Sequence, residues 1–369
     1  MPPLRGGAVE KIWYALGKEF ARRGHEVTHI SRTFGDLPQE ERIHGVRHIR
    51  VGGFDAPKSL VLLKCLDLVY SVRALNVLPP ADVIVTNTFW LPMLIRSQRF
   101  GRLYVHVARY PRGQMHFYGH AARLQTVSEV IKDAIIEEVP DLASAVECIP
   151  NPLPEAAPFD KIAVNGQRER YLLYVGRVHP EKGLDLLVSA ISLIPAELFA
   201  GWRLLIVGPA EARAGGGGEN YLNMLKKGTE PIRDRIEWVG PVYDSAKLAA
   251  YYRQSSLFLY PSLAERGETF GLAPLEAMSH GCPALVSDLP CFRDFIVQEE
   301  NGFVFDHRAM DAVSNLARSI ARLISDAGII DRVREAALSR SQDFALDRIA
   351  DRYLKDFQAV WNPCPAVST

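Results

Sequence analysis

Residues 171–183 read YLLYVGRVHPEKG, and this stretch decides which fold the chain can adopt. A continuous apolar run, a glycine and then an apolar helical pattern are typical of a buried parallel strand that leads into a helix. Arg177 and Lys182 stand where that helix begins. Cations beside a helix N-terminus suit a diphosphate, because the backbone N–H groups there point at an anion. Taken alone, the spacing favours the alternative of two solvated charges at a helix start.

A second stretch, residues 260–283, reads YPSLAERGETFGLAPLEAMSHGCP and holds Glu268 and Glu276 eight positions apart. On one helix they would be about 12 Å apart, too far for the carboxylate pair of a retaining glycosidase. With Glu268 in a loop and a helix starting near Gly271, both carboxylates flank a helix N-terminus, which suits a sugar nucleotide. The alternative is two solvated charges, but Glu276 stands in an apolar run, where burial without a partner is costly.

Short strand-like runs alternate with helical patterns along both halves of the chain, which predicts an α/β fold. The predicted strands are residues 26–31, 46–51, 82–86, 102–107, 123–127 and 146–149, then 171–175, 202–207, 235–239, 257–260, 284–287 and 302–305. Four prolines between residues 150 and 158 mark a linker. We therefore predict two doubly wound domains, over residues 1–150 and 165–342, followed by a helix over residues 345–361.

The start of the chain lacks one expected feature. A doubly wound sheet places its central first strand before the first glycine turn and helix. Here only MPPLR precedes Gly6 and Gly7, and these five residues contain two prolines and no apolar alternation. We expect that the first strand is missing because the chain starts too late. The alternative is a diverged sheet that forms without it.

The most apolar span, Ser59–Leu78, contains Lys64, Asp67 and Arg73, which an isolated membrane-spanning helix would rarely tolerate. We interpret it as a buried or interfacial helix. A core or interdomain position is favoured over a peripheral contact with a membrane, which stays open as an alternative.

Composition excludes several classes of protein. The 369 residues include 43 Lys and Arg and 43 Asp and Glu, so no net charge is available for a general grip on nucleic acid. The five cysteines include no CxxC pair, and no apolar leader opens the chain, which favours the cytoplasm. No Asp-x-Asp, G-x-G-x-x-G, P-loop, H-E-x-x-H or G-x-S-x-G sequence occurs, so we expect no metal and no cofactor.

Taken together, these motifs resemble those of the retaining GT-B glycosyltransferases of family 4, the glycosyl transferases group 1. The resemblance covers nearly the whole chain. In the first half, the shared motifs are Gly6-Gly7 followed by Glu10, a helix, and then RGHEV at residues 23–27. IPN at residues 149–151 is shared at the linker. In the second half, the shared motifs are V-G-R-x4-K-G at residues 175–183 and E-x7-E at residues 268–276 with the strand after it. The resemblance implies two Rossmann-like domains that face a cleft.

The resemblance also implies roles for single residues. Arg177 and Lys182 would hold the donor diphosphate, Glu268 would meet the donor sugar, and Glu276 would meet the ribose. The remaining donor-binding residues implied are Gly6, Gly7, His106, Gly176, Phe270, Gly271 and Leu272. His106 is equally well explained as a packed core histidine.

The implied activity is a metal-independent transfer of a hexosyl group, with retained configuration, from a nucleotide sugar. The acceptor would be a glycan or lipid-linked precursor of a cell-envelope or extracellular polysaccharide. Two alternatives stay open. One is a GT-B sugar-nucleotide epimerase, which would need no acceptor. The other is an inactive donor-binding remnant, because the first strand appears to be absent.

Overall fold

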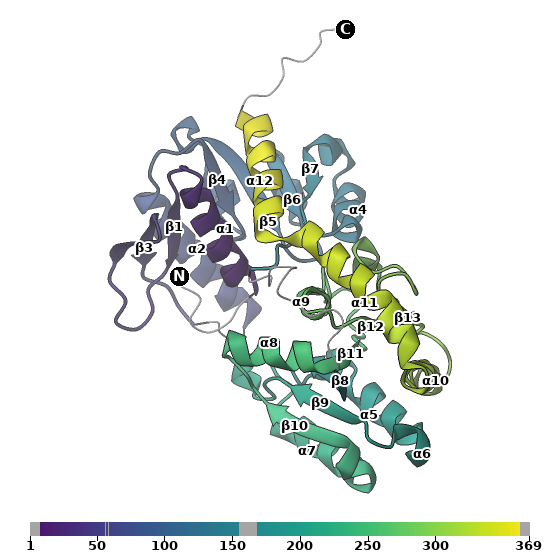
Figure 1. The fold of residues 1–369 in the computed structure, drawn as a ribbon. Coiled ribbons are helices and arrows are strands. Elements are labelled where there is room, and N and C mark those ends of the chain that lie inside the picture. The colour runs from purple at the N-terminus through teal and green to yellow at the C-terminus, as the bar shows by residue number, and fades with distance from the viewer. Residues whose placement is uncertain (1–7, 56, 58, 155–167, 362–369) are drawn as a thin grey trace. The chain divides into compact units, whose positions relative to one another are not determined.

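The computed structural model describes residues 8–55, 57, 59–154 and 168–361. The chain divides into two compact units, which are described separately (Figure 1). Unit 1 comprises residues 1–154 together with residues 344–369, and unit 2 comprises residues 155–343.

Unit 2 is built on one six-stranded parallel sheet, whose strands run in the order β10-β9-β8-β11-β12-β13. Its strands are β8 (Glu169–Val175), β9 (Arg203–Val207), β10 (Ile236–Gly240), β11 (Ser255–Tyr260), β12 (Ala284–Ser287) and β13 (Phe303–Phe305). Its helices are α5 (Leu184–Leu193), α6 (Ala196–Phe199), α7 (Glu219–Gly228), α8 (Ser245–Gln254), α9 (Leu272–Ser279), α10 (Ala312–Ser325) and α11 (Ala327–Ser341). This strand order is that of a dinucleotide-binding doubly wound sheet, with β8 as its first strand.

The interior of this sheet explains its apolar sequence. Leu172, Leu173 and Tyr174 on β8 are fully buried, as are the four residues of β12. Parallel strands covered by helices on both faces read as continuous apolar runs for this reason.

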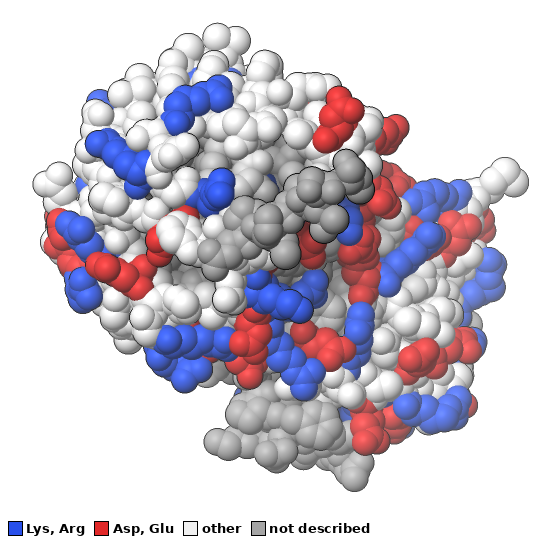
Figure 2. Space-filling view, turned by 90° about the horizontal axis from the view of Figure 1, so that it is seen from above, with Lys and Arg blue, Asp and Glu red and all other residues white. Residues whose placement is uncertain are grey.

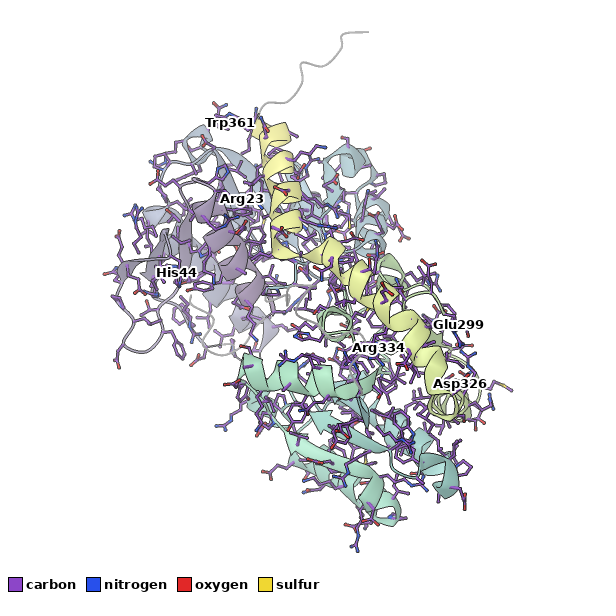
Figure 3. The ribbon with its side chains drawn as sticks, viewed as in Figure 1. Arg23, His44, Glu299, Asp326, Arg334 and Trp361 are labelled. Atoms are coloured by element: carbon purple, nitrogen blue, oxygen red, sulfur yellow. The ribbon has the colours of Figure 1, made fainter. Side chains whose placement is uncertain are left out.

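The buried Arg334 of α11, labelled in Figure 3, donates a hydrogen bond of 2.8 Å to the carbonyl oxygen of Gly281 after α9.

Unit 1 holds two sheets. One has the order β1-β3-β2 and the other the order β4-β5-β6-β7. The strands are β1 (Thr28–Arg32), β2 (Glu40–Ile43), β3 (Val46–Val51), β4 (Val83–Thr86), β5 (Arg102–Val107), β6 (Arg123–Thr126) and β7 (Val146–Cys148). The helices are α1 (Ala8–Arg22), α2 (Leu60–Val77), α3 (Leu91–Leu94), α4 (Glu129–Glu138) and α12 (Leu346–Trp361). All pairs are parallel except β2 with β3.

The described part of unit 1 begins with α1, and no described strand joins β1 to β4. Every residue of β1 is half-buried, whereas five of the six residues of β5 are buried. An interior strand of a parallel sheet is buried on both faces. Among the described strands, the sheets β1-β3-β2 and β4-β5-β6-β7 are therefore separate, and the missing first strand stays a prediction.

Two features of unit 1 depart from the sequence analysis. β2 is not predicted, because its sequence EERI lacks a continuous apolar run. It forms an antiparallel hairpin with β3 through His44 and Gly45, both at positive φ (Figure 3). Of the two positions predicted for residues 59–78, the buried one is wrong, because α2 buries only Ser71 and Ala74, and the interfacial one stays a prediction.

The end of the chain returns to unit 1 as α12, which packs on α1. Asp356 accepts hydrogen bonds from Arg123 at 2.5 and 3.0 Å and from the hydroxyl of Tyr104 at 2.8 Å. At the other end of the helix Arg23, labelled in Figure 3, pairs with Asp351. A helix that follows all of unit 2 in sequence is thus part of the core of unit 1.

Candidate functional site

The quoted motifs meet at one place in unit 2. The loop 176–183 follows β8 and the loop 261–271 follows β11, and these two strands are neighbours at the centre of the parallel sheet. The strand order reverses between them, because one half of the sheet extends outward from β8 and the other from β11. Open α/β sheets bind their ligands at this switch point, beyond the carboxyl ends of the strands.

The two loops are in close contact. A Cβ atom on Gly183, which has a φ of 67°, would lie 2.0 Å from the carbonyl oxygen of Pro261. The N–H of Leu263 donates to the carbonyl oxygen of Glu181 at 2.8 Å. Only glycine allows such an approach at positive φ. The glycine of the first motif therefore brings the second motif next to it.

This contact places Lys182 beside Glu268. Lys182 ends the short 3-10 turn Pro180–Lys182, and its Nζ lies 2.7 Å from Oε2 of Glu268. Both side chains are about one-tenth exposed, at 9% and 11%. Two of the sequence-predicted site residues, 86 positions apart, thus form a nearly buried ion pair.

Two further side chains hold the same carboxylate oxygen of Glu268. The hydroxyl of Tyr260 donates to Oε2 at 3.1 Å, and the hydroxyl of Ser262 lies 3.2 Å from it. Burial and the neighbouring Glu268 raise the pKa of Tyr260 well above its usual value, so its hydroxyl keeps its proton. Among the described residues, Oε1 accepts no hydrogen bond.

The sequence analysis did not include Tyr260 and Ser262 among the site residues. Both stand in YPS, directly before the E-x7-E stretch. Their position at the end of a predicted strand could have identified them, because residues at the carboxyl end of a central parallel strand face the ligand crevice.

Arg177 lies at the exposed rim of the first loop. Its Nη2 lies 2.6 Å from Oε1 of Glu181, and its Nη1 donates to the carbonyl oxygen of Gly215 at 2.7 Å. The Arg177 side chain is 43% exposed. A surface pair of this kind contributes little to stability, so the guanidinium can exchange Glu181 for an anionic ligand at low cost.

Gly176 is enclosed by Tyr174. A Cβ atom on Gly176 would lie 2.7 Å from the hydroxyl oxygen of Tyr174. That hydroxyl donates to the carbonyl oxygen of Arg177 at 2.8 Å. Tyr174 also stacks on Tyr260, with ring centroids 6.0 Å apart. Gly176 is thus required for the packing that shapes the turn after β8.

The helix α9 begins at Leu272, as the sequence predicts, with Gly271 as its N-cap at φ 90°. A Cβ atom on Gly271 would approach the ring of Phe292 within 2.3 Å. Phe270 is buried and packs on Phe295, with ring centroids 5.5 Å apart. The first N–H groups of a helix have no acceptor within it, so this end of α9 can bind an anion.

Glu276 lies on α9, where it is half-buried. The hydroxyl of Tyr252 donates to its Oε2 at 3.2 Å. Tyr252 is buried against the ring of His280, 5.4 Å away, and burial raises the pKa of the Tyr252 hydroxyl well above its usual value. The costly glutamate in the apolar run therefore has a buried partner, Tyr252, which the sequence analysis did not identify.

His106 belongs to unit 1, on β5, and is buried. Its Nδ1 lies 2.5 Å from Oε1 of Gln125, and its ring meets Trp13 edge-on at 5.3 Å. Burial lowers the pKa of His106 to about 4. It is packed as a core histidine. Gly6 and Gly7 lie outside the described residues.

In the part of the chain that the structure describes, no group of three or more His, Cys, Asp or Glu residues is arranged to hold a metal ion. The expectation of a metal-independent reaction stays a prediction.

Residues 158–340 match the family described as glycosyl transferases group 1. The lipopolysaccharide core biosynthesis mannosyltransferase LpcC of Rhizobium leguminosarum bv. viciae is 35% identical over 202 residues, which are 53% of this chain and 53% of that protein. The phosphatidyl-myo-inositol mannosyltransferase of Mycobacterium leprae is 28% identical over 190 residues, or 51% of this chain and 46% of that protein. In these matches the chain spans about half the length of its relatives.

Solved structures resemble the whole chain. Sucrose-phosphate synthase from Thermosynechococcus elongatus has a TM-score of 0.74 at 21% identity and covers 96% of this chain and 94% of its own. Anabaena HepE in complex with UDP has a TM-score of 0.72 at 18% identity, with 97% of each chain covered. These likenesses show the GT-B fold. The sequence of residues 158–340, most of the second unit, matches the glycosyl transferases group 1.

Proposed function

We propose that this protein is a retaining glycosyltransferase that moves a hexosyl group from a nucleotide sugar to a glycan or lipid-linked acceptor. The names of its relatives support synthesis of an envelope or extracellular glycan, because they include a lipopolysaccharide core mannosyltransferase and a phosphatidyl-myo-inositol mannosyltransferase. A nucleotide-sugar donor is supported by the solved structure of HepE with UDP-glucose.

The observation that supports this proposal best is that only one of the two carboxylate oxygens of Glu268 accepts hydrogen bonds from the described residues. Its Oε2 is held by Lys182, Tyr260 and Ser262, whereas Oε1 accepts no hydrogen bond from the described residues. A carboxylate oxygen accepts a hydrogen bond from a sugar hydroxyl. Lys182 needs one of its three N–H donors for Glu268, and the other two can bind a phosphate oxygen.

The reaction that we propose needs no protein nucleophile. The bond between the anomeric carbon and the β-phosphate oxygen breaks, and a bond forms on the same face to the acceptor oxygen. The acceptor hydroxyl gives its proton to the leaving diphosphate. Arg177 and Lys182 stabilise the charge that develops on this diphosphate, which is preorganised electrostatic catalysis.

We propose further that the reaction needs no metal ion, since Lys182 and Arg177 supply the positive charge. Turnover should be the same in EDTA as in buffer with added Mg²⁺ or Mn²⁺. A loss of turnover in EDTA that Mg²⁺ restores would overturn this part of the proposal.

The proposed location is the cytoplasm, with a peripheral membrane contact that would bring the site to a lipid-linked acceptor. Among the described cysteines, Cys65, Cys282 and Cys291 are thiols, which fits a reducing compartment. In Figure 2, blue and red side chains alternate over much of the surface in view, in keeping with equal numbers of acids and bases. Nucleic acid is therefore not among the proposed partners.

The first experiment is a thermal-shift screen against UDP, GDP, ADP and TDP and their common sugar conjugates. A ligand that binds only the folded protein raises Tm. We expect one nucleotide family to do so, and Glu276→Ala to abolish the shift. No shift with any of these ligands would overturn the proposal.

The two alternatives are separated by turnover. An epimerase converts the nucleotide sugar without an acceptor, whereas a transferase releases nucleoside diphosphate in proportion to acceptor glycosylated. A donor-binding remnant would show the thermal shift but no turnover of the nucleotide sugar, whichever acceptor is added. Mass spectrometry of donor and acceptor after incubation distinguishes these outcomes.

A further inference from the structure

The helix α2 has an unusual surface. Its sequence, LVLLKCLDLVYSVRALNV, is apolar around most of its circumference, yet only Ser71 and Ala74 are buried. A helix that is apolar all round is normally enclosed by protein or by lipid. The large apolar side chains of α2 that are exposed are Leu60, Val61, Leu62, Leu63, Val69 and Val72.

These side chains form a continuous surface. At about 100° per residue, Val69 and Val72 lie on the side of the helix opposite Ser71 and Ala74, and Val61 lies within about 20° of Val72. Val61 is 75% exposed, and Val69 and Val72 are 41% and 42% exposed. The whole first turn, Leu60–Leu63, is also exposed. We call the exposed side of α2 together with this first turn the α2 surface.

The exposed charges of α2 are both positive. Lys64 is exposed, with its Nζ 3.1 Å from the ring centroid of Phe89. Arg73 is exposed and lies over the ring of Phe54, which is itself 39% exposed. The single acid of the helix, Asp67, is half-buried, and backbone N–H groups of residues 89 and 90 donate to it. An apolar surface with cationic and no exposed acidic residues complements an anionic lipid headgroup layer.

The size of the α2 surface argues against a second copy of this chain as its partner. One face of this 18-residue helix, about 27 Å long and about 10 Å wide, offers on the order of 270 Å². A stable protein interface buries about 800 Å² per partner. A bilayer needs no complementary shape and takes up such a helix parallel to its surface. No helix of the described residues, α2 included, is long and apolar enough to cross a membrane.

We propose that the α2 surface binds the headgroup region of an anionic bilayer, with its valines and leucines inserted and Lys64 and Arg73 at the phosphates. This inference rests on the peripheral contact in the proposed function and gives it a location. The binding itself needs neither donor nor acceptor, so it can fail or succeed independently of glycosyl transfer.

The test is co-sedimentation of the full chain with vesicles of phosphatidylcholine, with and without phosphatidylglycerol. Val69→Asp with Val72→Asp should lower the partition coefficient at least about tenfold. Lys64→Gln with Arg73→Gln should lower it about tenfold on anionic vesicles only. Met224→Asp in unit 2, which replaces another exposed apolar side chain, is the matched control and should bind like wild type.

Circular dichroism of each variant is the control for correct folding. The proposal is wrong if the valine pair variant binds vesicles as well as wild type, or if wild type binds neither vesicle. It is also wrong if wild type is a dimer by light scattering and the valine pair variant is a monomer, because α2 would then be covered by a second copy.

A second inference concerns Glu268 and rests on the proposed donor site. We infer that Tyr260 and Ser262 are positioning residues, which hold Oε2 and so turn Oε1 toward the donor sugar. Tyr260 is buried between the stacked ring of Tyr174 and the ring of Phe292, so its hydroxyl has little freedom. A group held by packing and by hydrogen bonds keeps its geometry when a ligand arrives.

This positioning is tested by calorimetry with nucleoside diphosphate and with the nucleotide sugar. Tyr260→Phe should weaken binding of the nucleotide sugar about fivefold and leave that of the diphosphate within about twofold, since one hydrogen bond to a charged group is affected. In a Glu268→Gln background the same change should have no further effect.

Tyr353→Phe is the control, because the Tyr353 hydroxyl is buried in unit 1 and has no hydrogen-bond partner among the described residues. Equal weakening of both ligands by Tyr260→Phe, or an undiminished effect in the Glu268→Gln background, would overturn the positioning role. Wild-type protein that binds the diphosphate but not its sugar conjugates would instead overturn the proposed function.

Discussion

Arg177 and Lys182 come from one motif but have different environments. Lys182 is buried against Glu268, whereas Arg177 is exposed and pairs with the surface residue Glu181. A buried ion pair is costly to break, but an exposed one is nearly neutral. Lys182 is therefore part of a preformed site, and Arg177 is free to reorient when a diphosphate binds.

Arg177→Ala should consequently lower kcat without affecting the fold. We expect a loss of about 10²-fold, the usual effect of removing one hydrogen-bond donor to a developing charge. Tm should stay unchanged. Arg203→Ala is the matched control, because Arg203 forms an exposed pair with Glu237 at the start of β9, and it should keep wild-type turnover. Turnover of Arg177→Ala equal to wild type would remove Arg177 from the mechanism.

Gly271 shows why a glycine is needed in the second motif. An alanine there would meet the ring of Phe292 and keep a φ of 90°. Gly271→Ala should lower the free energy of unfolding by about 2 kcal/mol, measured by urea denaturation. Gly24→Ala separates the two causes, because Gly24 has a φ of 93° but no atom within 4 Å of its Cβ. It should cost only about 1 kcal/mol, and an equal loss would show that backbone strain alone is responsible.

At the scale of elements, β1 and β5 of unit 1 contain neutral histidines, the half-buried His29 and the buried His106. Burial lowers the pKa of His106 on β5 to about 4 and that of His29 on β1 to about 3. In the unfolded chain both titrate near 6.5. The folded protein therefore has its full stability above about pH 6.5, where both rings are neutral in the folded and in the unfolded chain. It loses stability as the pH falls toward the folded-state pKa values, because the unfolded chain then binds more protons.

Between pH 7.5 and 5.5 each histidine should lower the free energy of unfolding by about 1.4 kcal/mol. Urea denaturation over this range measures the slope. His106→Phe should reduce the change in the free energy of unfolding between pH 7.5 and 5.5 by about 1.4 kcal/mol, whatever its effect on stability at pH 7.5 itself. A slope equal to that of wild type would show that His106 is not buried as a neutral ring.

The elements also show which parts of the fold are predictable. Twelve predicted strands have a counterpart, and most of them contain an apolar run that the fold buries. β2 is missed since a solvated edge strand has no such run. α2 is placed in the wrong environment because its apolar composition is the same whether protein or lipid covers it.

At the scale of the whole molecule, unit 1 is completed by the last helix of the chain. Asp356 on α12 pairs with Arg123 on β6, and their side chains are only 10% and 15% exposed. Asp356→Ala leaves Arg123 without its partner and should lower the stability of unit 1 by about 3 kcal/mol.

Hydrogen exchange followed by mass spectrometry can assign this loss to unit 1, because peptides of unit 2 should keep their protection. Glu237→Ala, which breaks an exposed pair in unit 2, should change stability by less than about 0.5 kcal/mol. Loss of protection in unit 2 only, or an unaffected unit 1, would contradict the role of α12.

The sequence by itself determined the fold class, most of the strands, and the two motifs that meet at the switch point of unit 2. These are local properties, since apolar runs, turn glycines and helix starts are read from neighbouring residues. The tertiary structure alone decided that Lys182 and Glu268 form a pair, that Tyr260 and Ser262 share its oxygen, and that α2 is exposed. Such contacts join residues far apart in the chain, and they depend on the register of β8 against β11, which no local pattern encodes.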